Sequence, residues 1–197
     1  MEHQEKSKEE WFNLGLRYHE NEDYQKAVTA YRHVVKNDKY NVHAWHNLGL
    51  ALRFLGNLDA ALKAFNTAQS LDPMNGEICI QQGLILIGLE KNQEAIDKFN
   101  KAIELGLESG NLVTANIGRG ISYLNLDNPD EAISNFDAAL QIDNENLQAL
   151  TMKAGALLTR GDFSMAKSVV DKALKIDPED NEALKILEIV ESALSSA

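Results

Sequence analysis

The chain has 197 residues, of which 44% are hydrophobic and 7% aromatic, enough to bury a core. Its formal net charge of −11 argues against binding to nucleic acids or anionic membranes, because contacts to phosphate groups require Lys and Arg. No apolar run is long enough to predict a membrane-spanning helix, and the single cysteine, Cys79, excludes an intramolecular disulfide.

The N-terminal segment carries no targeting signal that we can identify. Its sequence, MEHQEKSKEEW, lacks the apolar stretch and the cleavage site of a secretion signal. We therefore expect a cytoplasmic protein.

An internal repeat begins close to the N-terminus. The segments WFNLG at residues 11–15 and WHNLG at residues 45–49 lie 34 residues apart. Other residue types recur at this interval, except between the third and fourth member of each series, where the step is 37 residues. The recurring residues are Gly15, Gly49, Gly83 and Gly120, then Ala27, Ala61, Ala95, Ala132 and Ala166, and then Tyr31, Phe65, Phe99 and Phe136, with Val170 in the fifth place.

Each repeated unit is expected to form two helices. Apolar residues recur at three- and four-residue steps, as in the series Trp11, Leu14 and Tyr18. The glycines and alanines should let paired helices approach closely, with the aromatic rings filling the space beside them. The expected breaks between helices are Gly56-Asn57, Asp127-Asn128-Pro129-Asp130 and Gly161-Asp162 within repeats, and Asp72-Pro73 and Asp177-Pro178 between repeats.

This combination of period and residue types resembles the tetratricopeptide repeat. The resemblance covers nearly the whole chain and implies an all-α fold, a right-handed α-solenoid of five helix-turn-helix repeats that forms a single domain over residues 1–197. A capping helix at 181–194 should cover the last repeat. The repeats are expected at 8–41, 42–75, 76–109, 113–146 and 147–180, with Gly110, Asn111 and Leu112 as an insertion before the fourth.

Several residues depart from the family pattern. They are Cys79 and Gln82 in the third repeat, Asn116 and Arg119 in the fourth, and Ala154 with a shifted Gly155 in the fifth. The pattern alone gives no partner for these polar side chains.

In this family the first helix of each repeat lines a concave groove, so the resemblance implies which side chains a peptide ligand would contact. Most of them are apolar. These groove-facing residues are Phe12, Asn13, Leu16, His46, Asn47, Leu50, Arg53, Phe54, Ile80, Gln81 and Leu84.

Three groove-facing amides, Asn13, Asn47 and Gln81, form what we call the amide row. An amide both donates and accepts hydrogen bonds, so the row could bind the backbone of an extended peptide whatever its side chains are. This resembles the asparagine ladders of some family members. The alternative is that these amides only solvate the edges of their helices.

A different kind of groove in the family, the carboxylate clamp, holds the acidic C-termini of heat-shock chaperones. It needs Lys and Arg at fixed positions, because a terminal carboxylate must meet fixed cations. Phe12, Leu16, Glu77 and Gln81 occupy positions that the clamp requires to be polar or cationic. We therefore expect no clamp, and Arg53 is the single groove cation that we can assign.

Neither a metal site nor an active site is predicted. His43 and His46 lie one helical turn apart, with Glu77 expected beside His43, but a metal site normally needs three or four ligands. No serine is embedded in a nucleophile elbow, and no set of acid, base and nucleophile can be assembled. We expect no enzymatic activity and no cofactor.

The sequence thus predicts a scaffold that binds a peptide or helix of a partner protein. The alternative is a structural protein that associates with itself into a homo-oligomer. In that case, apolar residues of the terminal helix, especially Ile186 and Ile189, would contact a second molecule.

Overall fold

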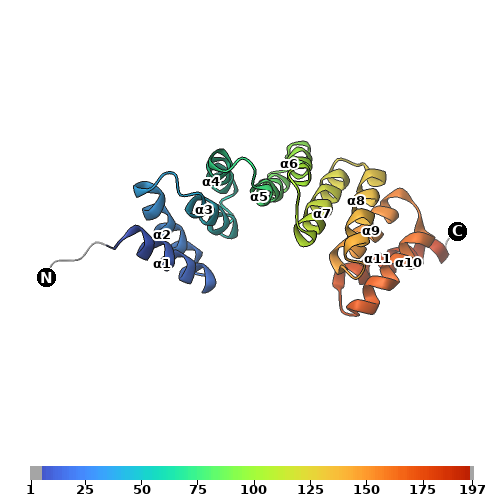
Figure 1. Ribbon diagram of the computed structural model, residues 1–197. Helices are drawn as coiled ribbons and strands as arrows, with labels where there is room; N and C mark the ends of the chain where they lie inside the picture. Colours follow the sequence, from blue (N-terminus) through green and yellow to red (C-terminus); the bar gives the residue numbers. More distant parts are fainter. Residues whose placement is uncertain (1–5, 196–197) are drawn as a thin grey trace. The chain divides into compact units, whose positions relative to one another are not determined.

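A computed structural model describes residues 6–195, and within this range the chain contains helices and no strand (Figure 1). The helices form five successive pairs followed by a terminal helix, which confirms the all-α fold of five helix-turn-helix repeats. They are α1 (Lys8–Glu20), α2 (Tyr24–Asn37), α3 (Val42–Phe54), α4 (Leu58–Leu71), α5 (Gly76–Gly88), α6 (Asn92–Glu104), α7 (Ser109–Asn125), α8 (Pro129–Ile142), α9 (Leu147–Arg160), α10 (Phe163–Ile176) and α11 (Asn181–Ser195).

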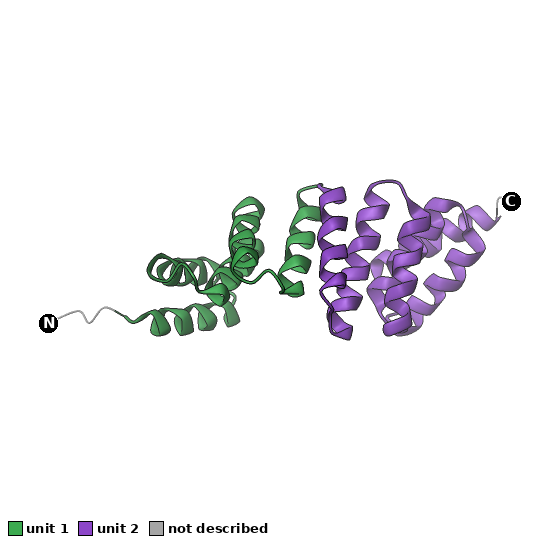
Figure 2. Ribbon diagram, turned by 45° about the horizontal axis from the view of Figure 1, so that its top comes forward, with its two compact units in different colours: residues 1–90 green, residues 91–197 purple. Residues whose placement is uncertain are grey.

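The chain divides into two compact units, Met1–Glu90 and Lys91–Ala197 (Figure 2). The boundary falls inside the third repeat, between α5 and α6. Within each unit, helices that follow one another in the chain pack against each other. That the two units together form a single domain stays a prediction.

Close packing of paired helices depends on a glycine that faces an aromatic ring. A Cβ atom added to Gly49 would lie 2.6 Å from Cε2 of Phe65, too close for any side chain unless the ring moved. The ring is fully buried and has little room to move. Such pairs are Gly15 with Tyr31, Gly49 with Phe65 and Gly120 with Phe136.

Side-chain caps occur at the start of the first helix of every repeat except the fourth, where α7 has none, and at the start of α11. In each case a side-chain oxygen accepts a hydrogen bond from the backbone N–H three residues later, at distances of 3.1, 2.9, 3.3, 3.0 and 2.6 Å in chain order. One such cap typically stabilises a helix by about 1 kcal/mol. The capping residues are Ser7, Asn41, Asn75, Asn146 and Asp180.

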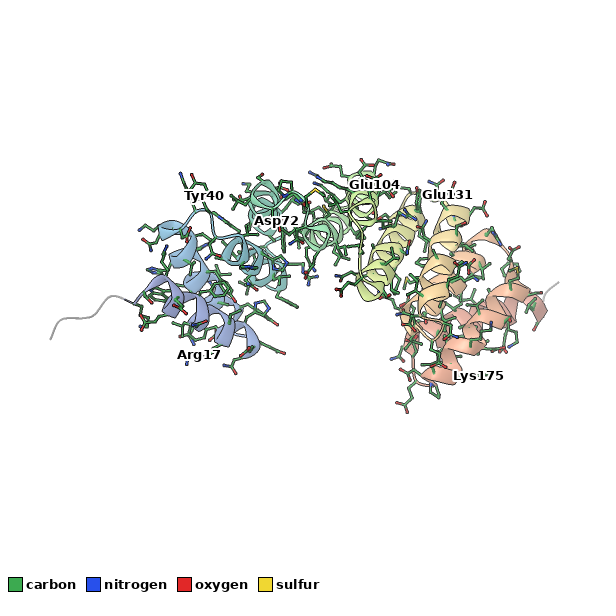
Figure 3. The ribbon with its side chains drawn as sticks, viewed as in Figure 1. Arg17, Tyr40, Asp72, Glu104, Glu131 and Lys175 are labelled. Carbon is green, nitrogen blue, oxygen red and sulfur yellow. The ribbon has the colours of Figure 1, made fainter. Side chains whose placement is uncertain are left out.

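The Asp-Pro dipeptides end the second helices as expected. Helix α4 ends at Leu71, directly before Asp72-Pro73; Asp72 is labelled in Figure 3. Asp72 accepts a hydrogen bond from Nδ2 of Asn75 at 3.1 Å. Pro129, expected in a break, is instead the first residue of α8. Proline fits that position because the first N–H groups of a helix have no partner within it.

The insertion before the fourth repeat lengthens a helix. Gly110, Asn111 and Leu112 lie inside α7, which has 17 residues, whereas α1, α3 and α5 have 13 each. The insertion therefore adds about one helical turn.

Two of the polar departures in the middle repeats, Gln82 and Arg119, have polar partners on neighbouring helices. Nε2 of Gln82 donates to Oδ1 of Asn66 at 2.8 Å. Within the second unit, Arg119 donates through Nη1 to Oδ1 of Asn100 at 2.8 Å and through Nε to Asn135. Burial lowers the pKa of Arg119, and amide oxygens rather than carboxylates bind its guanidinium. These side chains replace apolar packing between helices.

The terminal helix α11 packs against α9 and α10, which confirms that it covers the last repeat. Ile186 belongs to the buried core of the second unit and is only 8% exposed, so the prediction that it contacts a second molecule is wrong. Apolar residues lie around much of the circumference of α11, and their pattern alone does not determine which of them pack inward. Leu184 and Ile189 remain on the outside, 43% and 53% exposed.

Candidate functional site

The groove-facing residues of the first unit lie on α1, α3 and α5. Phe12, Leu16, Leu50 and Leu84 are half-buried, so each keeps apolar surface that a ligand could contact. Ile80, in contrast, is 2% exposed and offers little surface.

The members of the amide row differ in their hydrogen bonding. Asn13 is exposed. Asn47 donates through Nδ2 to the carbonyl oxygen of His43 in its own helix at 2.9 Å, which leaves Oδ1 as an acceptor. Gln81 has a buried Oε1 with no donor among the described residues. Asn13 and Asn47 can therefore accept hydrogen bonds as they stand, whereas the Oε1 atom of Gln81 is covered by neighbouring side chains. To donate a hydrogen bond to a ligand, Asn47 would have to break its bond to the carbonyl oxygen of His43.

His46 lies between two repeats. Its Nε2 atom is 3.9 Å from Oε1 of Glu77 on α5, and its ring packs edge-on against Phe65 with centroids 5.4 Å apart. Burial lowers the pKa of His46, Glu77 acts in the opposite direction, and His43 lowers it further. We expected Glu77 beside His43, but the histidine nitrogen recorded near its carboxylate is Nε2 of His46, and this contact is an ion pair only when His46 is protonated.

An aromatic cluster with one cation lies at the C-terminal ends of α1 and α3. Phe54 stacks on Tyr24 with centroids 4.6 Å apart, and His19 packs edge-on against both rings. The Cζ atom of Arg53 lies 5.0 Å from the Phe54 centroid. We call His19, Tyr24, Arg53 and Phe54 the rim cluster. Tyr24 was not predicted, because it comes from a second helix, whereas the groove-facing positions were assigned on first helices only.

Unpaired polar atoms gather on this face of the first unit. Among the described residues, seven buried side-chain nitrogen or oxygen atoms have no hydrogen-bond partner. Four of the seven belong to His19, His46, Arg53 and Gln81. Burial also lowers the pKa of His19. These four atoms are buried as well as without a hydrogen bond, so a ligand could pair with them only where the side chains that cover them move.

We also searched the described residues for a metal site, a reactive thiol and a membrane-spanning helix. Within residues 6–195 no group of three or more His, Cys, Asp or Glu side chains could hold a metal ion. The thiol of Cys79 is buried and lies 2.9 Å from Oε1 of Gln69. Over the same range no helix combines the length and the apolar character needed to cross a bilayer.

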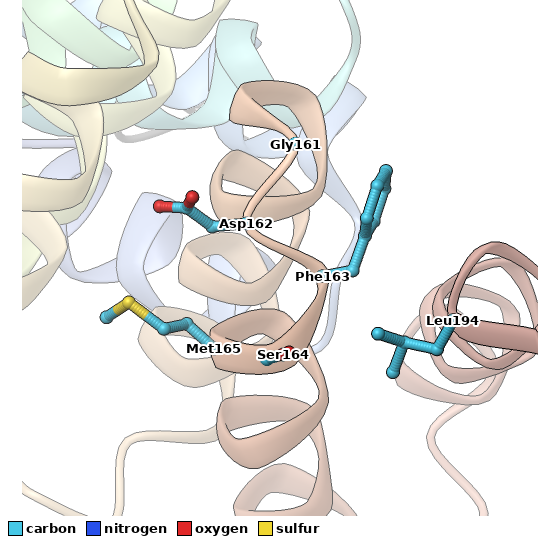
Figure 4. Close-up of a pocket in the computed structure, with 6 residues that line it drawn as sticks. All are labelled: Gly161, Asp162, Phe163, Ser164, Met165 and Leu194. Carbon is cyan, nitrogen blue, oxygen red and sulfur yellow. The ribbon is translucent and has the colours of Figure 1, made fainter. Parts of the chain in front are cut away.

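A small hollow in the second unit lies between the start of α10 and the end of α11. It measures about 240 Å³ and is lined by Phe163 and Leu194, whose side chains face each other across it (Figure 4). No ionisable group other than Asp162 lines this hollow, and in Figure 4 that carboxylate points away from Leu194. The hollow is a gap at the edge of the last repeat and offers no chemistry of its own.

Three models of the tetratricopeptide repeat family match the chain. They cover residues 11–41 and 76–105, residues 42–75, and residues 123–188. A TPR repeat-containing protein of Methanocaldococcus jannaschii is 29% identical over 192 residues, which are 97% of this chain and 33% of that protein. The chain thus spans about a third of the length of the curated relative that it matches.

Solved structures with the same fold cover most of the chain. PilW, described as a widely conserved type IV pilus biogenesis factor, has a TM-score of 0.86 and 22% identity over 96% of this chain and 87% of its own. YrrB, described as a TPR protein with an unusual peptide-binding site, has a TM-score of 0.74 and 22% identity, covering 91% of each chain. A MamA structure has a TM-score of 0.76 and 22% identity over 87% of this chain and 92% of its own. At such identities the likeness shows the fold alone.

Proposed function

The chain belongs to the tetratricopeptide repeat family, and we propose that its first unit binds an extended peptide segment of a partner protein along α1, α3 and α5. In this proposal the protein is a cytoplasmic interaction scaffold, works without a cofactor and catalyses no reaction. The ligand is a protein segment and not a nucleic acid.

The observation that carries the proposal is the gathering of unpaired polar atoms on His19, His46, Arg53 and Gln81. A buried polar atom without a partner destabilises a fold by about 1–3 kcal/mol. The backbone N–H and C=O groups of an extended peptide recur at regular intervals and could pair with such atoms once the side chains that cover them move aside. Binding would then recover free energy that the unbound protein lacks.

The apolar residues beside the amide row fit the same ligand. Phe12, Leu16 and Leu50 are half-buried and leave apolar surface for alternate side chains of the peptide. Asn13 is free to donate and accept, and Asn47 can accept through Oδ1. Hydrogen bonds to the peptide backbone would allow many ligand sequences to bind. Contacts between the apolar residues and the peptide side chains would determine which sequences bind best.

The solved structures of the same fold support protein interaction as the class of function. They do not identify which residues of this chain bind a ligand. One protein of the same fold is described as having a peptide-binding site, at 22% identity. Because fold does not fix function, the assignment of the face in this chain rests on its own side chains.

The test starts from a ligand selected from a random library of linear peptides on the wild-type protein. Its affinity is then measured by calorimetry for Asn13→Ala with Asn47→Ala. Each lost amide contributes on the order of 1 kcal/mol, so the double variant should bind at least about tenfold more weakly. Its melting temperature should stay normal, since these amides lie outside the core.

A matched control replaces two other asparagines of the first unit that lie away from the amide row. Asn37 on α2 donates to the carbonyl oxygen of His33 at 2.9 Å, the same bond that Asn47 makes to His43. Asn57 is exposed, like Asn13. Asn37→Ala with Asn57→Ala should leave affinity unchanged. Equal losses in both double variants, or none in either, would contradict the proposed face.

A second candidate function is self-association through α11. The observation that favours it is the exposed apolar surface of Leu184 and Ile189. Light scattering should then show a defined oligomer that Ile189→Glu disrupts. Ile142→Glu, which changes an exposed isoleucine on α8, is the control and should leave the oligomer intact. A monomer at all concentrations would rule this candidate out.

A further inference from the structure

Helix α2 carries cations and no carboxylate between Tyr24 and Asn37, although the chain as a whole has a net charge of −11. Lys26 pairs with Asp23 at 2.6 Å. Arg32 and Lys36 are exposed and form no ion pair within residues 6–195. The exposed surface of α2 is therefore positively charged, whereas the chain as a whole is negatively charged.

Aromatic rings lie beside these cations. The Trp11 ring stacks on His33 with centroids 4.2 Å apart and an interplanar angle of 6°. Nζ of Lys6 lies 5.3 Å from the Trp11 centroid. We call Lys6, Trp11, Arg32, His33 and Lys36 the cationic shelf.

The surface of the shelf is hollowed at two places that share His33. One hollow measures about 430 Å³ and is lined by Lys6, Ser7, Lys8, Trp11, His33 and Asn37. The other measures about 260 Å³ and is lined by Thr29, Arg32, His33 and Lys36. The two hollows lie on either side of His33, and each has room for a side chain of a partner.

We propose that the cationic shelf is a second binding surface, distinct from the groove-facing residues, and that it binds an acidic, carboxylate-rich segment of a partner protein. Arg32 and Lys36 provide donors for carboxylates. The Trp11 and His33 rings provide an apolar wall for the methylene groups of glutamate side chains. Lys8 at the edge of the shelf is already paired with Asp38 at 3.2 Å, so Arg32 and Lys36 are the cations left for a ligand.

Charge favours a short acidic segment over longer polyanions. At physiological salt the field of a charge is screened over about 8 Å, so a short segment meets mainly the cations of the shelf. A nucleic acid or an anionic membrane extends further and meets the carboxylates of a chain with net charge −11. The same cations are too few to offset that repulsion.

Trp11 supplies a reporter inside the shelf. The chain has two tryptophans, so Trp45→Phe leaves Trp11 as the single source of indole fluorescence. The probe is hexaglutamate, added to the full chain at low ionic strength. We expect a saturable change in Trp11 emission that weakens steeply as salt is added.

Two double variants distinguish the contribution of the shelf residues to hexaglutamate binding from the effect of the net charge of the chain. Arg32→Gln with Lys36→Gln should weaken hexaglutamate binding by about three- to tenfold, as expected for the loss of two exposed ion pairs. Lys172→Gln with Lys175→Gln makes the same change in charge on exposed lysines of α10 and should leave affinity unchanged. If the first double variant fails to fold, the single variants Arg32→Gln and Lys36→Gln replace it.

Three results would overturn the proposal. The first is no saturable change up to about 1 mM hexaglutamate, a concentration that would detect even weak binding. The second is equal weakening in both double variants, which would mean that only net charge matters. The third is a stronger response to hexalysine or to phosphatidylserine vesicles, the latter assigning the shelf to a lipid surface.

Discussion

Two alanine substitutions on first helices of the second unit should change stability in opposite directions. Gly120 lies within α7 and Gly155 within α9. Replacing a glycine inside a helix with alanine favours folding by about 1 kcal/mol, because glycine loses more conformational freedom. The two sites share this gain and differ in the space around the new methyl group.

The space at each site sets the sign of the net effect. A Cβ atom at Gly120 would lie 2.6 Å from Cε1 of Phe136, whereas one at Gly155 would lie 3.7 Å from Cδ1 of Ile186. Carbon atoms prefer a separation of about 3.5–4.0 Å, so the buried Phe136 ring would have to move by about 1 Å. Overpacking of this kind costs about 1–3 kcal/mol. We expect Gly120→Ala to destabilise by up to about 2 kcal/mol and Gly155→Ala to stabilise by about 0.5–1 kcal/mol.

Urea unfolding followed by circular dichroism measures both effects as shifts of the midpoint at constant slope. A rescue variant tests the cause. In a Phe136→Leu background the ring is gone, so the additional cost of Gly120→Ala should largely disappear. The reasoning is refuted if both alanine variants shift the midpoint in the same direction, or if the cost of Gly120→Ala is undiminished without the ring.

Three further predictions follow from single residues. Glu22 and Asp127 adopt φ angles of 59° at a turn where the second and fifth repeats have glycine, so replacing either with glycine should stabilise by about 0.5–1 kcal/mol in thermal unfolding. Tyr31→Phe should keep or raise the melting temperature, because the Tyr31 hydroxyl is buried without a partner and burial raises its pKa to about 12. Burial lowers the pKa of His19 and His46 below the ordinary 6.5, so the unfolded chain binds more protons than the folded one and stability should fall as pH drops from about 7.5 to 5.5. His19→Gln with His46→Gln should reduce that fall, and an unchanged pH profile would contradict it.

The features that sequence predicts well are those fixed by local signals or by the repeat itself. Asp72-Pro73 ends α4 because proline cannot continue a helix, and the Gly49 and Phe65 pair follows from their constant spacing. In the fifth repeat, different residues occupy the two positions of this pair. Ala154 takes the place of the glycine and Val170 that of the aromatic residue, and both lie in the same buried core.

The features that sequence could not predict depend on contacts between distant residues. The partners of Gln82 and Arg119 lie on other helices, so neither Asn66 nor Asn100 could be assigned from the family pattern. The burial of Ile186 depends on how α11 rotates against α9, which a helical wheel leaves open.

In the candidate site, the sequence correctly placed Arg53 and Phe54 on one helix but could not pair Phe54 with Tyr24. That contact joins a second helix to the first helix of the next repeat. A family pattern that assigns ligand contacts to first helices alone cannot include it.

The most direct test of peptide binding by the first unit is the response of individual side-chain amides to a selected peptide. In ¹⁵N-labelled protein, the side-chain NH₂ resonances of Asn13, Asn47 and Gln81 can be followed by NMR while the peptide is added. The account predicts that these three resonances shift and saturate together, while those of Asn37 and Asn57 stay in place. Shifts confined to Asn37 and Asn57, or saturable binding that leaves the amide row unmoved, would contradict it.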